Sequence, residues 1–184
     1  MLNKQEFKKI MNDLALFEKN RELEIEKSRD IIRMSKLIIN SLHRKDLKDA
    51  AVHVKEIKIK IKKLDRKDYD ISLNNVAMQE YVEALCYYEF VVNNYIPTRA
   101  DLNADTENYL LGMCDLTGEL VRRAVDSAIR KDFNEVLLIK SLVAEIYGMF
   151  LEFNLRNGEL RKKMDSIKYN LMKLEDLAYK VSLK

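Results

Sequence analysis

The scarcity of glycine and proline is the feature that most restricts how this chain can fold. Its 184 residues include four glycines and one proline, which leaves little material for the tight turns between the strands of a sheet. Hydrophobic residues make up 47% and charged residues 34%, as in globular proteins rather than disordered ones. We therefore expect an all-α fold that forms a single domain over residues 1–184.

Hydrophobic residues recur three and four positions apart over most of the chain, as in amphipathic helices. The first such segment, from Asn3 to Arg44, predicts one helix of about 60 Å, longer than a small domain can cover. A helix of this kind usually packs on a partner or in a long bundle. Five further helices are expected, at about 46–64, 73–94, 106–129, 133–154 and 160–182.

Three stretches between these helices need an interpretation of their own. The run "KEIKIKIKK" at 55–63 alternates like a strand, but the helical spacing of "LKDAAVHV" leads into it, so a helix is the preferred prediction. The run "DRKDYDISLNN" is expected to be a connector. "PTRADLNADTEN" is expected to be a loop, in which Asp105 or Thr106 caps the next helix.

Composition also bears on localisation and on cysteine chemistry. No window approaches 18 consecutive apolar residues, so we expect no membrane span. The first residues mix both charge signs, and we expect no secretory signal. Cys86 and Cys114 are expected to be reduced core residues of an intracellular, cytoplasmic protein. A cysteine nucleophile assisted by His43 or His53 is the alternative, whereas no zinc-binding spacing is present.

The charges are unevenly distributed along the chain. The net charge is +3, from 33 basic and 30 acidic residues. Arg99 is nevertheless the only basic residue between Asp68 and Glu119, a stretch that holds ten acidic residues. The middle of the chain is therefore acidic and both flanks are basic, an asymmetry that suggests a functional region.

Two pairs of carboxylates stand out in this acidic middle. Glu80 and Glu83 are three residues apart and Asp115 and Glu119 are four apart, so each pair lies on one face of its helix. Because a single loop connects the two helices, we expect them to pack antiparallel and to bring the four carboxylates to one groove.

Converging carboxylates would repel one another and raise one another's pKa unless a cation balances them. Mg²⁺ or Mn²⁺ prefers such oxygen ligands and can support hydrolysis of a phosphodiester. The alternative is that these acids belong to ordinary solvated helix faces. Against it, Glu80, Glu83 and Asp115 have no lysine or arginine three or four residues away.

Two motifs together carry a resemblance to a known family. "QEYVEA" at 79–84 is followed by "YLLGMCDLTGELVRRAVDS" at 109–127 and later by "NLRNGELRKKMDSIKYNLMKLEDLAYKVS". This combination resembles the translin superfamily, and within it the catalytic branch of translin-associated factor X. The likeness covers about residues 78–182, whereas the first seventy residues match only in helical character and basic content.

The resemblance implies a fold of about seven helices that assembles into a hollow oligomer, usually an octamer. It implies that Glu80, Glu83 and Asp115 are residues of a Mg²⁺-dependent endoribonuclease and that Glu119 lines the same site. In translin itself, apolar residues replace the glutamate pair. Eukaryotic catalytic members carry a long insertion between the two helices, so the short link of this chain is closer to an archaeal-type member that acts as a homo-oligomer.

Contacts to RNA phosphates are expected from basic residues that flank the acidic region. The candidates are Arg122, Arg123, Lys58, Lys62 and Lys63, and the alternative for each is a solvated side chain or an ion pair. The leading hypothesis is an endoribonuclease that uses Mg²⁺, or Mn²⁺ in its place, on single-stranded RNA or single-stranded parts of duplexes. The alternatives are a protein that binds single-stranded RNA or DNA without cutting it, and a helical scaffold.

Overall fold

The computed structural model describes residues 2–64 and 72–183, and its regular elements in these residues are all helical. Six α-helices and one 3₁₀-helix follow one another, which confirms the all-α prediction of about seven helices for the described residues. The elements are α1 (Lys4–His43), α2 (Leu47–Lys60), η1 (Ile61–Lys63), α3 (Leu73–Asn93), α4 (Thr106–Ile129), α5 (Phe133–Leu151) and α6 (Glu159–Ser182).

The helix boundaries follow the capping residues in the sequence. Asp46, Asp105 and Asp132 each accept a hydrogen bond from a backbone N–H of the helix they precede, which satisfies one otherwise unpaired donor. The helical interpretation of 55–63 is confirmed, with a final 3₁₀ turn. Helix α5 ends at Leu151, three residues before the expected end. Residues 65–71 of the expected connector lie outside the described residues.

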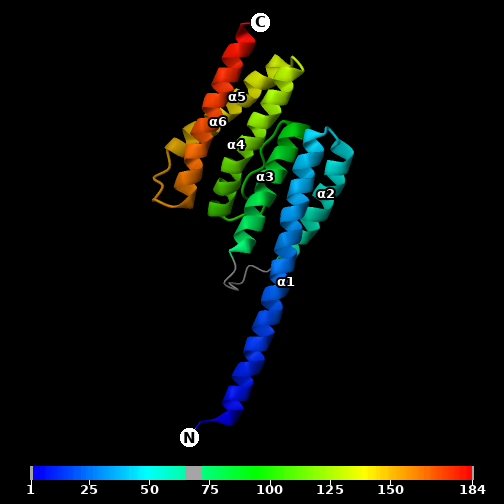
Figure 1. Ribbon diagram of the computed structural model, residues 1–184, viewed down its shortest axis with the longest axis vertical. Coiled ribbons are helices and arrows are strands. Elements are labelled where there is room, and N and C mark those ends of the chain that lie inside the picture. The colour runs from blue at the N-terminus through cyan, green and yellow to red at the C-terminus, as the bar shows by residue number, and fades with distance from the viewer. Residues whose placement is uncertain (1, 65–71, 184) are drawn as a thin grey trace.

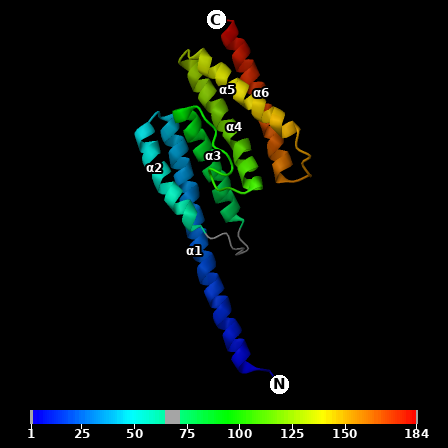
Figure 2. The ribbon, with the colours of Figure 1, turned by 180° about the vertical axis from the view of Figure 1, so that it is seen from behind.

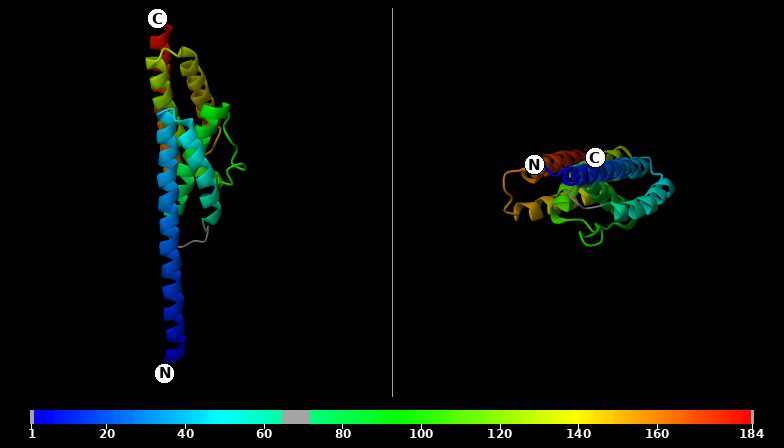
Figure 3. Two further views of the ribbon diagram at one scale, coloured as in Figure 1. Left: turned by 90° about the vertical axis from the view of Figure 1, so that its right-hand side faces the viewer. Right: turned by 90° about the horizontal axis from the view of Figure 1, so that it is seen from below.

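Four helices, α1, α3, α4 and α6, run in the same direction and lie next to one another in that order, whereas α2 and α5 run the opposite way (Figures 1 and 2). Helices α2 and α5 and the loop before α4 project on the same side of the molecule, away from α1 and α6 (Figure 3). Residues distant in the sequence therefore become neighbours on four adjacent, parallel helices.

The expectation that α3 and α4 pack antiparallel is wrong. Gln79 donates to Asn108 at 3.1 Å near the start of both helices. Val82 packs against Gly112 one turn later in both, so α3 and α4 run in the same direction. The reason is the loop 94–105, whose twelve extended residues could reach about 40 Å, more than the roughly 31 Å of a 21-residue helix. The Tyr109 hydroxyl donates to the Pro97 carbonyl at 3.0 Å and ties this loop to α4.

The hydrophobic core surrounds α3, which is buried along most of its length. Helix α1 contributes only its second half, beginning around residue 24. Its first half extends beyond the body of the molecule (Figure 1) and leaves large apolar side chains exposed: Phe7, Ile10, Met11, Leu14, Leu16 and Phe17. The expectation that α1 is longer than the domain is confirmed. In the described part of the chain, no helix is long and apolar enough to cross a membrane.

Gly112 determines how closely α3 and α4 approach each other. A Cβ atom at this position would lie 2.7 Å from the Cβ of Val82 and 2.8 Å from the carbonyl oxygen of Gln79. Because these distances are shorter than van der Waals contact, no larger residue fits without separating the helices. Gly112 lies one turn before Asp115, so the close approach occurs beside the carboxylates.

Candidate active site: an acidic cluster on four parallel helices

The four carboxylates converge, although the helices that carry them are parallel. The pKa of the Glu83 carboxyl is raised first by burial and then by the negative charges of Asp115, Glu80 and Glu119. These four side chains, from α3 and α4, are called the acidic cluster below. The sequence prediction that they share a site is therefore consistent with the structure, although the helix orientation assumed for it was not.

Glu83 is the member of the acidic cluster with the most unusual environment. Burial and the neighbouring carboxylates raise its pKa from 4.5 to about 8, so its carboxyl is mostly protonated at neutral pH. No side chain within residues 2–64 and 72–183 forms a hydrogen bond or an ion pair with it. Glu83 is thus the one carboxyl of the cluster that has no direct counter-ion within these parts of the protein.

Glu80 lies one turn before Glu83, and a lysine of α1 partly neutralises its charge. Its pKa is raised by burial and by Asp115, while Lys36 acts in the opposite direction. The Lys36 ammonium lies 3.8 Å from the Glu80 carboxylate, and 65% of the Lys36 side chain is exposed. This ion pair is long and open to solvent, so it neutralises Glu80 only weakly.

Asp115 forms a close ion pair with a lysine of α6. Its carboxylate accepts a hydrogen bond from the Lys163 ammonium at 2.5 Å. Helix α6 is held in register against α4 by Asn170, whose amide donates to the Thr117 hydroxyl at 2.9 Å. Lys163 therefore reaches the cluster from a fixed helix, 48 residues away in the sequence.

Glu119 is held by a histidine at the end of α1. The Nε2 atom of His43 is hydrogen-bonded to the Glu119 carboxylate, and because a carboxylate only accepts, the ring donates from Nε2. In the neutral ring, Nδ1 can then accept from the Tyr87 hydroxyl, 3.3 Å away. Arg122 approaches Glu119 from the same helix, at 3.8 Å.

The chemistry of the acidic cluster suits a hard divalent cation. All four donors are carboxylates, which Mg²⁺ and Mn²⁺ prefer, and a bound cation would relieve the repulsion that keeps Glu83 protonated. In the described ranges, however, no three histidine, cysteine, aspartate or glutamate side chains are already arranged to hold a metal ion. Lys163 and His43 instead occupy Asp115 and Glu119.

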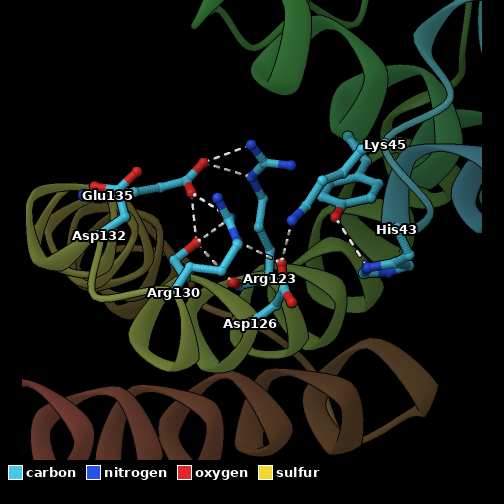
Figure 4. A network of polar contacts seen from close by, with 9 residues as sticks. His43, Lys45, Arg123, Asp126, Arg130, Asp132 and Glu135 are labelled. Carbon is cyan, nitrogen blue, oxygen red and sulfur yellow. Dashed lines mark hydrogen bonds and ion pairs between the residues drawn. The ribbon is translucent and has the colours of Figure 1, made fainter.

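The predicted RNA-contacting arginines separate into an exposed residue and a partly buried one. Arg122 is 66% exposed at the edge of the acidic cluster. Arg123 is only 18% exposed and donates from Nε to the Glu135 carboxylate at 2.7 Å, within a network that also includes Arg130 and Asp126 (Figure 4). Arg122 is therefore an accessible cation, whereas Arg123 already has an ion-pair partner, and its contact with RNA stays a prediction.

The three predicted lysines lie away from the acidic cluster. Lys58 approaches Glu89 at 3.7 Å, and Glu89 is nine residues after Glu80, which places it on the opposite face of α3. Lys62 lines a pocket of about 250 Å³ with Lys58 and Tyr81. The third, Lys63, is exposed at the end of η1. A contact of these lysines with RNA remains a prediction, but it would occur on another surface.

The cysteine alternative is not supported. Cys86 and Cys114 are buried, and burial raises the pKa of both thiols to about 12, which keeps them in the unreactive thiol form. The sequence interpretation missed Lys36, His43 and Lys163 as residues of the site. Each lies on a helix other than that of its carboxylate, so spacing within a helix gave no signal.

The family relationship is visible over most of the chain. The family model for the Translin family matches residues 19–184. An uncharacterised protein of Methanocaldococcus jannaschii is 31% identical over 163 residues, or 85% of this chain and 73% of that protein. The translin of Gallus gallus is 38% identical over 80 residues, which cover 44% of this chain and only 35% of that translin.

Solved structures show the same fold. The structure of apo-NeC3PO has a TM-score of 0.90 and 27% identity, with 98% of both chains covered. The structure of AfC3PO in complex with duplex RNA has a TM-score of 0.82 and 24% identity, with 97% of this chain and 96% of that chain covered. The sequence match and this shared architecture agree, and the chain belongs to the Translin family.

Proposed function

We propose that this protein is a metal-dependent endoribonuclease that cleaves single-stranded RNA, or single-stranded parts of duplex RNA. The observation that carries the proposal is Glu83, a glutamate with a pKa of about 8 among three other carboxylates. A purely structural helix surface would gain nothing from such repulsion, whereas a site for a divalent cation requires concentrated negative charge.

Glu80, Glu83, Asp115 and Glu119 would hold Mg²⁺, or Mn²⁺ in its place. The bound ion would activate a water molecule and offset charge that develops on the phosphoryl group. His43 and Tyr87 keep the Glu119 carboxylate oriented through the two ring nitrogens of His43. Lys36 and Lys163 reduce the repulsion between the carboxylates before the ion binds.

Recognition of RNA is supported by the family and by the charges beside the site. A structure of AfC3PO, which shares this fold, has been solved in complex with duplex RNA. In this chain, the exposed Arg122 offers a phosphate contact at the rim of the acidic cluster. Contacts of this kind are independent of base identity, so we propose cleavage with little sequence preference.

The protein would act as a homo-oligomer, with the site inside a hollow assembly such as an octamer. The supporting observation is the first half of α1, which exposes apolar residues such as Phe7 and Met11 over several turns. An exposed apolar helix face of this length is typical of a surface that packs on another protein. A second copy of the same chain is the simplest partner for it.

A second candidate function is binding of single-stranded RNA or DNA without cleavage. It is favoured by the ion pairs in the acidic cluster, because Asp115 and Glu119 already have partners in Lys163 and His43. In this alternative, the carboxylates stabilise the contacts between helices and bind no metal. The two candidates differ in whether a divalent cation changes the state of the RNA.

The test is cleavage of a 5′-labelled single-stranded RNA by the purified oligomer in Mg²⁺, in Mn²⁺ and in EDTA. We expect divalent-dependent cutting that falls at least about a hundredfold in Glu83→Gln and in Asp115→Asn. The matched control is Glu89→Gln, which makes the same change on the opposite face of α3 and should retain activity. All variants must keep the oligomer size of the parent protein.

Three other results would change the assignment. Retention of RNA without cutting under any metal condition would favour the binding protein. Cutting that survives both Glu83→Gln and Asp115→Asn would mean that the acidic cluster is not the active site. Equal loss of activity in Glu89→Gln would show that the substitutions act through the stability of α3 rather than through the cluster.

A further inference from the structure

Lys163 lies closer to a carboxylate of the acidic cluster than Lys36 does, and its position beside Asp115 has a further consequence for metal binding. Its ammonium lies 2.5 Å from the Asp115 carboxylate, and its charge also partly opposes the rise in the pKa of Glu80 and of Glu83. One side chain therefore acts on three of the four carboxylates. It lies where a divalent cation shared by these carboxylates would have to compete with it.

Lys163 combines a side chain that can rotate with a helix that is anchored in the core. Helix α6 is anchored by Met164 and Ile167, which are buried in the core, and by the Asn170–Thr117 hydrogen bond. The Lys163 side chain itself is 27% exposed. A lysine has four rotatable carbon–carbon bonds, so its ammonium can leave Asp115 without movement of the helix.

A single lysine cannot do what a divalent ion does in this cluster. Lys163 carries one positive charge and contacts Asp115, whereas the acidic cluster holds four carboxyl groups, and Glu83 forms no hydrogen bond or ion pair within the described residues. A divalent cation carries twice the charge and binds several oxygen atoms at once. It would therefore displace the ammonium from Asp115, and the displaced ammonium would remain beside the bound ion.

We propose that Lys163 is the resident counter-ion of the acidic cluster, that a divalent cation displaces it from Asp115, and that the released ammonium then contacts a phosphate of the RNA. This proposal rests on the proposed function. It makes Lys163 a substrate-contacting residue on α6, in addition to Arg122 on α4. Phosphate is a suitable acceptor, because lysine binds it as a compact point charge.

The proposal predicts that one substitution shifts two affinities in opposite directions. Lys163→Met removes the competing cation, so the metal-free protein should bind Mn²⁺ about fivefold more tightly, as measured by the loss of the electron paramagnetic resonance signal of free Mn²⁺. At saturating Mn²⁺, the KM for single-stranded RNA should rise about fivefold, because a phosphate contact is lost. Loss of stability alone would not tighten metal binding.

Two control variants test whether the effect depends on the position of the lysine and on its charge. Lys162→Met makes the same change at the adjacent exposed residue and should leave both quantities within about twofold. Lys163→Arg keeps the charge and should restore Mn²⁺ affinity to near the parent value. Unchanged or weaker Mn²⁺ binding by Lys163→Met, with intact binding by the parent, would overturn the role of Lys163 alone. No Mn²⁺ binding by the parent would overturn the proposed metal site as well.

Discussion

Helix α4 takes part in two clusters of charged residues that differ in their balance of charge. In the network near its C-terminal end, Lys45, Arg123, Asp126, Arg130 and Glu135 each contact an opposite charge (Figure 4). In the acidic cluster one to two turns earlier, Glu83 has no such contact within the described residues and its pKa rises to about 8. The balanced network is typical of structural stabilisation, whereas the unbalanced cluster is typical of a binding site.

The first prediction concerns the balanced network. Glu135 accepts from Arg123 and Ser127 and contacts Arg130 at 3.3 Å. Glu135→Gln leaves Arg123 largely buried without its counter-charge, so we expect the free energy of unfolding to fall by about 3 kcal/mol. The measurement is urea denaturation, with Mn²⁺ affinity as a second readout. A large loss of Mn²⁺ affinity in the folded variant would contradict the division between the two clusters.

The second prediction concerns the close contact that brings α3 and α4 together. Gly112→Ala places a methyl group 2.7 Å from Val82, so the helices must separate, at a cost of about 2 kcal/mol in the free energy of unfolding. Because Asp115 is one turn away, Mn²⁺ affinity should fall as well. Gly118→Ala is the matched control, since its nearest atom would lie 3.9 Å away. Equal effects of the two substitutions would remove Gly112 from this role.

The third prediction uses the pKa of Glu83 to measure the uncompensated negative charge of the acidic cluster. The folded-state pKa of about 8 lies above the ordinary value of 4.5, so the folded protein binds more protons than the unfolded one between these values. The free energy of unfolding therefore falls as pH rises from about 4.5 to 8. Glu83→Gln lacks this dependence and should exceed the parent in stability at pH 9 by about 2–4 kcal/mol.

Denaturation at pH 5 and pH 9 without divalent ions gives this comparison. At pH 5, parent and Glu83→Gln should be nearly equally stable, because the Glu83 carboxyl is protonated in the folded protein. Glu135→Gln serves as the contrasting variant and should show no such gain at pH 9. If the parent and Glu83→Gln changed in parallel with pH, the acidic cluster would be as balanced as the network around Glu135.

The sequence predicted the helices well because their signals are local. Hydrophobic spacing and capping residues such as Asp105 and Asp132 lie within or next to the helix they define. The direction of α4 relative to α3 is not local, and its prediction was wrong. A twelve-residue loop is long enough either to turn back at once or to run the length of α3, and composition does not decide between these paths.

The site was predictable in its carboxylates but not in its cations. Glu80, Glu83 and Asp115 stood out because they have no basic residue three or four positions away, and Glu119 because it lies one turn after Asp115. Their counter-ions Lys36, His43 and Lys163 come from α1 and α6, far away in the sequence. The ion pair of Arg123 could not be predicted for the same reason, since its partner Glu135 lies on the next helix.

The last prediction, with the smallest expected effect, concerns the different roles of the neighbouring arginines Arg122 and Arg123. Arg122→Ala removes an exposed cation beside Glu119, so RNA affinity should fall about three- to tenfold, with a decrease of about one in the slope of log affinity against log salt. Stability should change by less than about 0.5 kcal/mol. Arg123→Ala should instead destabilise the fold by leaving Glu135 without its closest counter-ion.

Filter binding of labelled single-stranded RNA at several salt concentrations, together with urea denaturation, measures both quantities. The exposed Arg122 should thus affect RNA binding, and the partly buried Arg123 should affect stability. The reverse pattern, with RNA binding lost in a stable Arg123→Ala protein and kept in Arg122→Ala, would place the RNA over the balanced network. The excess charge of the acidic cluster would then not mark the surface that meets RNA, and the comparison between the two ends of α4 would fail.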